Sequence, residues 1–182
     1  MFTTTPFSAW ELNDDLLAGL ESIGWEFATQ VQKETIPLAL SGKDVIGQAR
    51  TGSGKTAAFG LPTMNSCQPT GELQALILAP TRELANQVAE ELSNIQGNTG
   101  LNIQTVYGGT DLEKQAKNLQ AGVDIIVGTP GRVMDMTERG FINLEKPTFF
   151  VLDEADRMLD MGFFPDIMWV IERMTNREQT LL

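Results

Sequence analysis

The sequence predicts an α/β fold, in which helices flank a mostly parallel β-sheet. Three observations support this class: short apolar runs alternate with helix-like stretches, residues 75–79 are apolar at every position, and 182 residues suit a single domain. Repeated strand, helix, strand units require right-handed crossovers, which place the strands in parallel.

Six segments have the composition and length of strands. They span residues 44–48, 75–79, 103–107, 124–128, 149–153 and 179–182. Residues that start and stop helices bound the stretches between them. These signals predict helices over residues 56–61, from Thr81 to about Ile95, and over residues 111–120, before Gly122.

The first 42 residues are expected to form a helical preface without a strand, as part of the same domain as residues 43–182. Asn13 is a candidate N-cap for a helix over residues 14–22, which Gly24 ends, and Thr29 opens a second helix running toward Gly42. At the other end, the sequence stops within a predicted buried strand. We therefore expect the chain to be cut at a domain boundary.

The composition excludes several kinds of chemistry. The chain has no histidine, which removes histidine triads and histidine-ligated zinc, and its one cysteine cannot form an internal disulfide. The longest apolar run, residues 73–79, is interrupted by Gln74 and is too short to span a membrane. These features predict a cytoplasmic protein. The net charge of -11 argues at first against a nucleic-acid partner.

A glycine-rich stretch between a predicted strand and a predicted helix is typical of a phosphate-binding loop. There, backbone N–H groups and the helix dipole attract an anion, a lysine contacts the phosphates and a hydroxyl ligates Mg²⁺. The first glycine of the strict pattern is replaced by an alanine, so only the relaxed pattern holds. The candidate ATP-binding residues are Ala49, Arg50, Thr51, Gly52, Ser53, Gly54, Lys55 and Thr56. The alternative is a glycine-rich turn with a solvated lysine.

Two carboxylates follow the apolar strand at residues 149–152. Ligands bind at the carboxyl ends of parallel strands, so these residues should lie on the side of the phosphate loop. We expect Asp153 to hold Mg²⁺, together with Thr56 and largely through water, and Glu154 to orient or deprotonate an attacking water. With Lys55 they are the candidate catalytic residues. The alternative is that Asp153 only caps the next helix.

Five motifs occur in an order that resembles one family. They read GWEFATQVQ at residues 24–32, PTRELA at 80–85, Gly-Gly at 108–109, TPGR at 129–132 and DEAD at 153–156. The chain resembles the DEAD-box family of ATP-dependent RNA helicases over nearly its whole length. The resemblance implies the first of two RecA-like domains.

The resemblance implies that residues 24–32 read adenine. Gln32 has the amide donors and acceptor to pair with adenine, and Trp25 stands at the family's base-stacking position. The family's usual proline and isoleucine are Ala28 and Val31 here, which predicts slightly looser adenine selectivity. Without the resemblance, Thr29 and Gln32 would be interpreted as a helix capping box.

Three further motifs would contact RNA phosphate and ribose without selecting a base. The residues are Pro80, Thr81, Arg82, Gly108, Gly109, Thr129, Pro130, Gly131 and Arg132. The alternative is ordinary loop and cap chemistry at the start of helices. Residues 43–110, which include the first two of these motifs, carry four basic and five acidic side chains and are nearly neutral. The acidic surplus of the chain therefore lies mainly before and after these residues.

By this resemblance, the full-length protein is an RNA-dependent ATPase that unwinds short duplexes. The second RecA-like domain, with its arginine finger, is missing from these residues, as is the Ser-Ala-Thr motif expected soon after Leu182. We expect a monomer that binds single-stranded or short duplex RNA weakly, binds ATP and Mg²⁺ weakly and hydrolyses little ATP. A phosphate-loop transferase and a non-catalytic nucleotide-binding or partner-binding module remain the alternatives.

Overall fold

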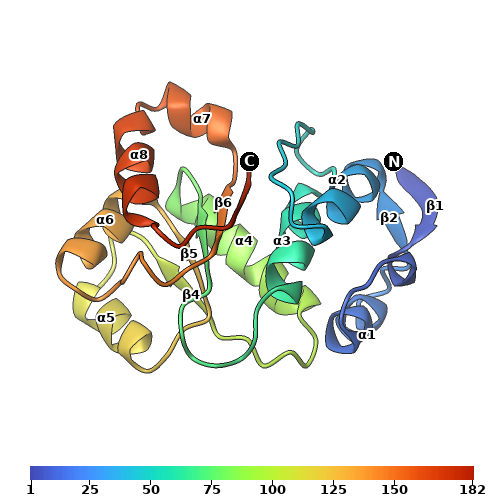
Figure 1. Cartoon of the computed structure of the whole chain (residues 1–182), viewed down its shortest axis with the longest axis horizontal. Coiled ribbons are helices and arrows are strands. Elements are labelled where there is room, and N and C mark those ends of the chain that lie inside the picture. The colour runs from blue at the N-terminus through green and yellow to red at the C-terminus, as the bar shows by residue number, and fades with distance from the viewer.

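A computed structural model describes all 182 residues, and its central feature is a five-stranded parallel sheet (Figure 1). The strand order is β4-β5-β3-β6-β7. The strands are β3 (Ala75–Leu78), β4 (Ile103–Val106), β5 (Ile125–Gly128), β6 (Phe149–Leu152) and β7 (Gln179–Leu181). The predicted α/β class is confirmed, with five of the six predicted strands in place.

Helices cover both faces of the sheet because its strands bury side chains on both sides. Successive strand residues point to opposite faces. Ala75 and Ile77 join a core with α1 to α4, whereas Leu76 and Leu78 join a second core with α5 to α8. The helices are α1 (Asp14–Ser22), α2 (Gln30–Leu40), α3 (Lys55–Asn65), α4 (Arg82–Ile95), α5 (Leu112–Gln120), α6 (Pro130–Glu138), α7 (Ala155–Asp160) and α8 (Phe164–Arg173), with a short 3₁₀ helix η1 (Phe7–Ala9).

The central strand β3 fixes the register of its neighbours. Ala75 is aligned with both Ile125 of β5 and Phe149 of β6, and all these pairings are parallel. The carboxyl ends of the strands therefore meet at one edge of the sheet. Every loop that leaves a strand and enters a helix starts from that edge, which is where ligands bind in open α/β sheets.

The expectation that the first 40 residues contain no strand is wrong. β1 (Phe2–Pro6) pairs antiparallel with β2 (Phe27–Thr29) in a separate two-stranded sheet. The Thr3 hydroxyl donates a hydrogen bond of 2.8 Å to the carbonyl of Ala28, which is buried. Neither strand shows a sustained alternation in the sequence, and β2 has only three residues. The pairing depends on contacts between segments that are distant in sequence.

The predicted strand over residues 44–48 is also wrong. Val45 forms an isolated parallel bridge with Leu181, and Ile46 is 79% exposed. Backbone hydrogen bonds of 3.0–3.2 Å join residues 45–47 to residues 180–182. Beyond Gly47 the backbone turns into the phosphate loop, so the segment follows the edge of the sheet too briefly to make a ladder.

The predicted helix starts are confirmed by their caps. The side chain of Asn13 accepts a hydrogen bond from the backbone N–H of Leu16 at the start of α1, and Asp111 caps α5 in the same way. α3 begins at the expected place but runs to Asn65, since Pro62 lies inside the helix without ending it.

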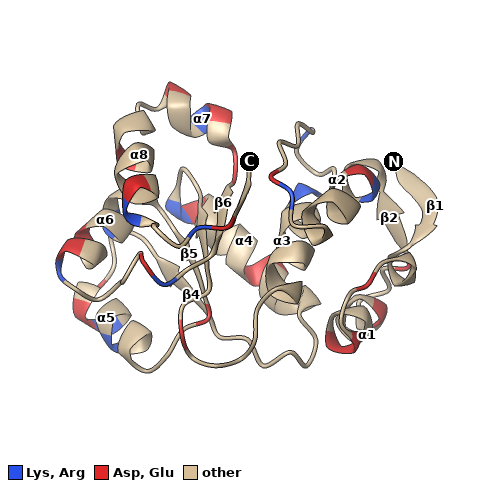
Figure 2. Cartoon of the chain, viewed as in Figure 1, with Lys and Arg blue, Asp and Glu red and all other residues tan.

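Charge is distributed unevenly over these elements. Figure 2 shows acidic residues on α1 without a basic one, whereas α5 to α8 carry both signs. No helix in the structure is long and apolar enough to cross a membrane.

Candidate functional site

The phosphate loop lies between the bridge at Val45 and the start of α3. Two glycines in it have positive φ, 80° at Gly52 and 89° at Gly54, a conformation that L side chains rarely adopt. A Cβ at Gly54 would also lie 2.5 Å from Nε2 of Gln32. Only glycine fits there, so the loop conformation depends on this residue.

The loop leaves polar groups available for an anion. Gly54 is the N-cap of α3 and provides no side-chain cap, so the N–H groups of the first turn have no such acceptor. The hydroxyl of Ser53 is buried without a hydrogen-bond partner. Lys55 is absent from the three ion pairs of the protein. These donors fit a nucleotide phosphate, which would accept from them.

The two predicted catalytic carboxylates follow β6 directly. Burial raises the pKa of Asp153 to about 6, against the opposing effect of Lys55, while Glu154 and Glu91 add to the rise. The N-cap of α7 is Glu154, so the alternative reading of Asp153 as that cap is not supported. Glu154 is the only non-glycine residue with positive φ, at 55°, and its carboxylate lies 3.4 Å from Arg157. A backbone held in this region stores strain, which is common at functional sites.

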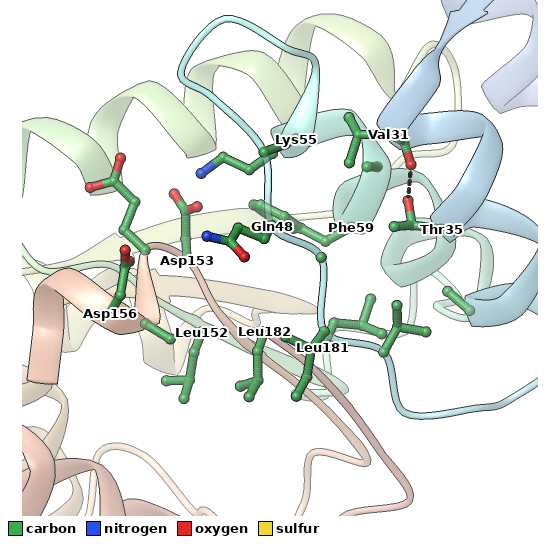
Figure 3. Close-up of a pocket in the computed structure, with 18 residues that line it drawn as sticks. Val31, Thr35, Gln48, Lys55, Phe59, Leu152, Asp153, Asp156, Leu181 and Leu182 are labelled. Atoms are coloured by element: carbon green, nitrogen blue, oxygen red, sulfur yellow. Dashed lines mark hydrogen bonds between the residues drawn. The ribbon is translucent and has the colours of Figure 1, made fainter.

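Two cavities of about 370 Å³ each meet at Lys55, Asp153 and Glu154. One extends along Gln48, Ala49, Leu181 at the end of β7 and Leu182. Figure 3 shows Lys55 and Asp153 in this cavity, facing one another. The other cavity contains most of the predicted ATP contacts, namely Trp25, Gln32, Thr51, Gly52, Gly54 and Thr56. Arg50 and Ser53 line neither cavity.

Gln32 takes part in a capping box, as the alternative interpretation predicted. Its Oε1 accepts from the backbone N–H of Thr29 at 2.9 Å, and its Nε2 donates to the carbonyl of Gly54 at 3.1 Å. The side chain is only 2% exposed. One N–H and one lone pair of the amide stay free, so an adenine contact requires the buried side chain to become accessible rather than to give up its partners.

Aromatic residues form the outer part of the same cavity. Trp25 is stacked on Phe7, with 6.4 Å between ring centroids and 22° between planes, and both residues line the cavity. Phe27 also lines it and is 40% exposed, although no separate role was expected for this residue. The signal that could have found Phe27 is a second aromatic residue two positions after Trp25, within the residues expected to read adenine.

Glu91 is a second residue that the sequence did not reveal. It lies on α4 and lines the cavity that contains Thr56 and Asp153. Burial raises the pKa of Glu91, and the nearby Thr56 hydroxyl opposes that rise. Nothing in its sequence context distinguishes it from a solvated helix residue, because its approach to Thr56 depends on the packing of α3 against α4.

The three predicted RNA motifs lie along the other half of the same sheet edge. Residues 80–82 follow β3, residues 108–109 follow β4 and residues 129–132 follow β5, and these strands are neighbours. Thr81 caps α4 and accepts from the N–H of Leu84, whereas Thr129 makes no side-chain cap at α6. The alternative interpretation as a helix cap is therefore confirmed for Thr81 and wrong for Thr129.

The arginines of these motifs are held by neutral groups. Arg82 lies over the ring of Tyr107, 5.0 Å from its centroid. Arg132 donates to the carbonyl of Thr110 at 3.4 Å and to the side chain of Gln115 at 3.1 Å. Neither arginine is in an ion pair. Both keep a full positive charge for an anionic ligand.

The raised pKa of Asp153 predicts a pH-dependent stability effect. Its folded-state pKa of about 6 exceeds the ordinary value of 3.8, so its stabilising contribution is present below pH 3.8 and is lost as the pH rises through 6. In metal-free buffer, Asp153→Asn should raise the free energy of unfolding at pH 8 by about 1–3 kcal/mol, and by less at pH 5. Denaturant melts would measure both values. The exposed Asp160→Asn is the control, and an equal gain at both pH values would contradict the assignment.

Comparisons with known proteins identify the family. The model of the DEAD/DEAH box helicase family matches residues 29–182. The DEAD-box ATP-dependent RNA helicase CshA of Streptococcus pneumoniae is 50% identical over 177 residues, which cover 97% of this chain and 34% of the relative. The RNA helicase CrhR of a Synechocystis species is 48% identical, over 97% of this chain and 36% of the relative. The chain thus spans about a third of these relatives' length.

Solved structures agree with this result. The crystal structure of a DEAD box protein from Methanococcus jannaschii superposes with a TM-score of 0.92 at 39% identity. The match covers 100% of this chain and 50% of that one. The parallel sheet with helices on both faces is therefore the RecA-like domain of such proteins. The chain belongs to the DEAD/DEAH box helicase family.

Proposed function

We propose that this chain is the ATP-binding part of an RNA-dependent ATPase that unwinds short RNA duplexes. One observation carries the proposal: a single edge of the sheet presents two adjacent sets of unpaired cationic and N–H donors. Lys55 and the first turn of α3 form one set, and Arg82 and Arg132 form the other. Two anionic ligands side by side match an enzyme that couples a nucleotide to a nucleic acid.

ATP is the expected ligand of the first set. Residues 49–56 would surround its phosphates, with Lys55 reaching the β- and γ-phosphates. Glu154 lies beside Asp153 in both cavities, where a carboxylate could orient or deprotonate the attacking water.

Mg²⁺ would be held by Thr56 and Asp153, in the latter case largely through water. Both residues line one cavity, and hydroxyl and carboxylate oxygens are the ligands that this ion prefers. When bound, the ion would offset charge on the phosphates. Its positive charge would also oppose the raised pKa of Asp153, so binding should favour the ionised carboxylate.

RNA is the proposed ligand of the second set. The nine residues of the three motifs offer two hydroxyls, backbone N–H groups and two arginines, which suit phosphate and ribose rather than base edges. We therefore propose binding to single-stranded or short duplex RNA without sequence specificity, by a monomer. The near balance of charge over residues 43–110 predicts low affinity for this chain alone.

Gln32 is the proposed determinant of adenine specificity, with Trp25 stacking on the base. Gln32→Ala should lower affinity for ATP and GTP alike, because it breaks the bond to Gly54, but it should also reduce the ATP-over-GTP preference. Competition binding with both nucleotides measures that ratio. An unchanged ratio would refute the adenine role. Weaker binding of both nucleotides would then be explained by the lost bond to the phosphate loop.

A second RecA-like domain is the proposed partner that completes the enzyme. An arginine finger raises phosphoryl-transfer rates by about 10³ to 10⁵, and the relatives have further chain in which such a domain could reside. We predict that this chain binds nucleotide weakly and that phosphate release stays near background with and without RNA. Strong RNA-stimulated turnover by the chain alone would show that no second domain is needed.

A pair of substitutions tests the two-ligand proposal. Lys55→Ala should weaken binding of Mg²⁺ and an ATP analogue about tenfold or more and leave RNA affinity unchanged. Arg82→Ala should do the reverse. Titration calorimetry for the nucleotide and fluorescence anisotropy for a labelled single-stranded RNA measure the two affinities. Lys43→Ala, an exposed lysine outside both cavities, is the control.

Either alternative function would give a different pattern. A phosphate-loop transferase would respond to Lys55→Ala but would bind no RNA through Arg82. A non-catalytic module would bind nucleotide and remain inactive even when joined to the rest of a longer protein.

A further inference from the structure

Gln115 of α5 connects two of the RNA motifs through three hydrogen bonds. Its Nε2 donates to the carbonyl of Tyr107 at 3.1 Å and to the hydroxyl of Thr110 at 2.6 Å. Its Oε1 accepts from Nη1 of Arg132 at 3.1 Å. A single side chain thus contacts both ends of the loop that contains Gly108 and Gly109, and also contacts the arginine in the first turn of α6.

The loop that Gln115 holds has few other restraints. Gly108 and Gly109 are exposed, and a Cβ at Gly108 would meet no atom within 4 Å. Besides Gln115, the Thr110 hydroxyl donates to the carbonyl of Tyr107 at 3.1 Å, and Arg132 donates to the carbonyl of Thr110 at 3.4 Å. A glycine pair is conformationally permissive, so its geometry depends on these bonds at its two ends.

An amide is the side chain best suited to this position. It donates to the loop and accepts from Arg132 at the same time, without adding charge. A carboxylate would accept from Arg132, but it would offer no donor to Tyr107 and would neutralise the arginine. Gln115 therefore orients Arg132 and leaves its charge available.

The same cluster reaches the third motif through Tyr107. Arg82 lies over the Tyr107 ring at 5.0 Å from its centroid, and a Cβ at Gly109 would lie 3.5 Å from Nη1 of Arg82. Tyr107 thus accepts a hydrogen bond from Gln115 through its carbonyl and contacts Arg82 through its ring.

We propose that Gln115 is a positioning residue for RNA binding, which holds Arg132 and the 107–110 loop in their binding geometry without touching RNA. This inference depends on the proposed RNA role of Arg132. It assigns a function to an α5 residue that lies outside all five motifs.

Three variants of the chain test the proposal by RNA anisotropy at low salt. Gln115→Met, similar in size but without the hydrogen bonds, should raise the RNA Kd about threefold to tenfold. Gln115→Glu should weaken binding further and lower the slope of log K against log salt by about 0.7, because it neutralises one phosphate contact. Gln120→Met, on the same helix and exposed, should have no effect. Nucleotide affinity should not change in any variant.

A double-mutant cycle separates positioning from general destabilisation. In an Arg132→Ala background, Gln115→Met should raise the RNA Kd by a smaller factor than it does in the wild type, since one of the two groups that it positions is gone. An equal loss in both backgrounds would overturn the proposal. So would wild-type affinity in Gln115→Met when Arg132→Ala binds weakly. If Arg132→Ala itself binds normally, the proposed RNA role of this arginine fails first, and the inference fails with it.

A measurement without RNA tests directly whether Gln115 holds the side chain of Arg132. The ¹⁵N heteronuclear NOE of the Arg132 Nε–Hε group should fall in Gln115→Met and stay at the wild-type value in Gln120→Met. An unchanged NOE would show that Gln115 does not hold the guanidinium.

Discussion

The parallel register of β3 with β5 and β6 is the constraint on which the site depends. Because Ala75 aligns with both neighbours, the loops after these strands emerge at the same height on one edge of the sheet. The residues that we propose to bind the nucleotide lie toward β6 and β7, and the residues that we propose to bind RNA follow β3, β4 and β5. Their proximity follows from strand order and needs no linker or special loop.

The polar groups at this edge lower the folding stability of the unliganded protein, but they suit the binding of a ligand. Asp153 is buried with a raised pKa, Glu154 has a strained backbone and the hydroxyl of Ser53 has no partner. Each feature is unfavourable in the unliganded protein. Each also fits a ligand that supplies the missing positive charge or hydrogen-bond acceptor. Glu91 on α4 extends this pattern, since burial raises its pKa beside Thr56.

Local signals in the sequence were sufficient to predict most of the fold and to locate the motifs. The apolar run at β3, the cap at Asn13 and the glycines of the phosphate loop each act within a few residues, so the sequence reveals them. The two short strands β1 and β2 were missed, and residues 44–48 were given a strand that they do not form, because both outcomes depend on distant pairing. The contact of Gln115 with Arg132 was invisible for the same reason, because Arg132 belongs to a different helix, α6.

Mapping the two ligands onto the chain tests the central claim most directly. Amide ¹H–¹⁵N shifts would be followed during titration with magnesium and an ATP analogue, and separately with single-stranded RNA. The nucleotide should shift residues 49–56 and the RNA residues 80–82, 108–110 and 129–132, so that the two sets lie side by side on one edge. RNA shifts confined to another surface would contradict the account.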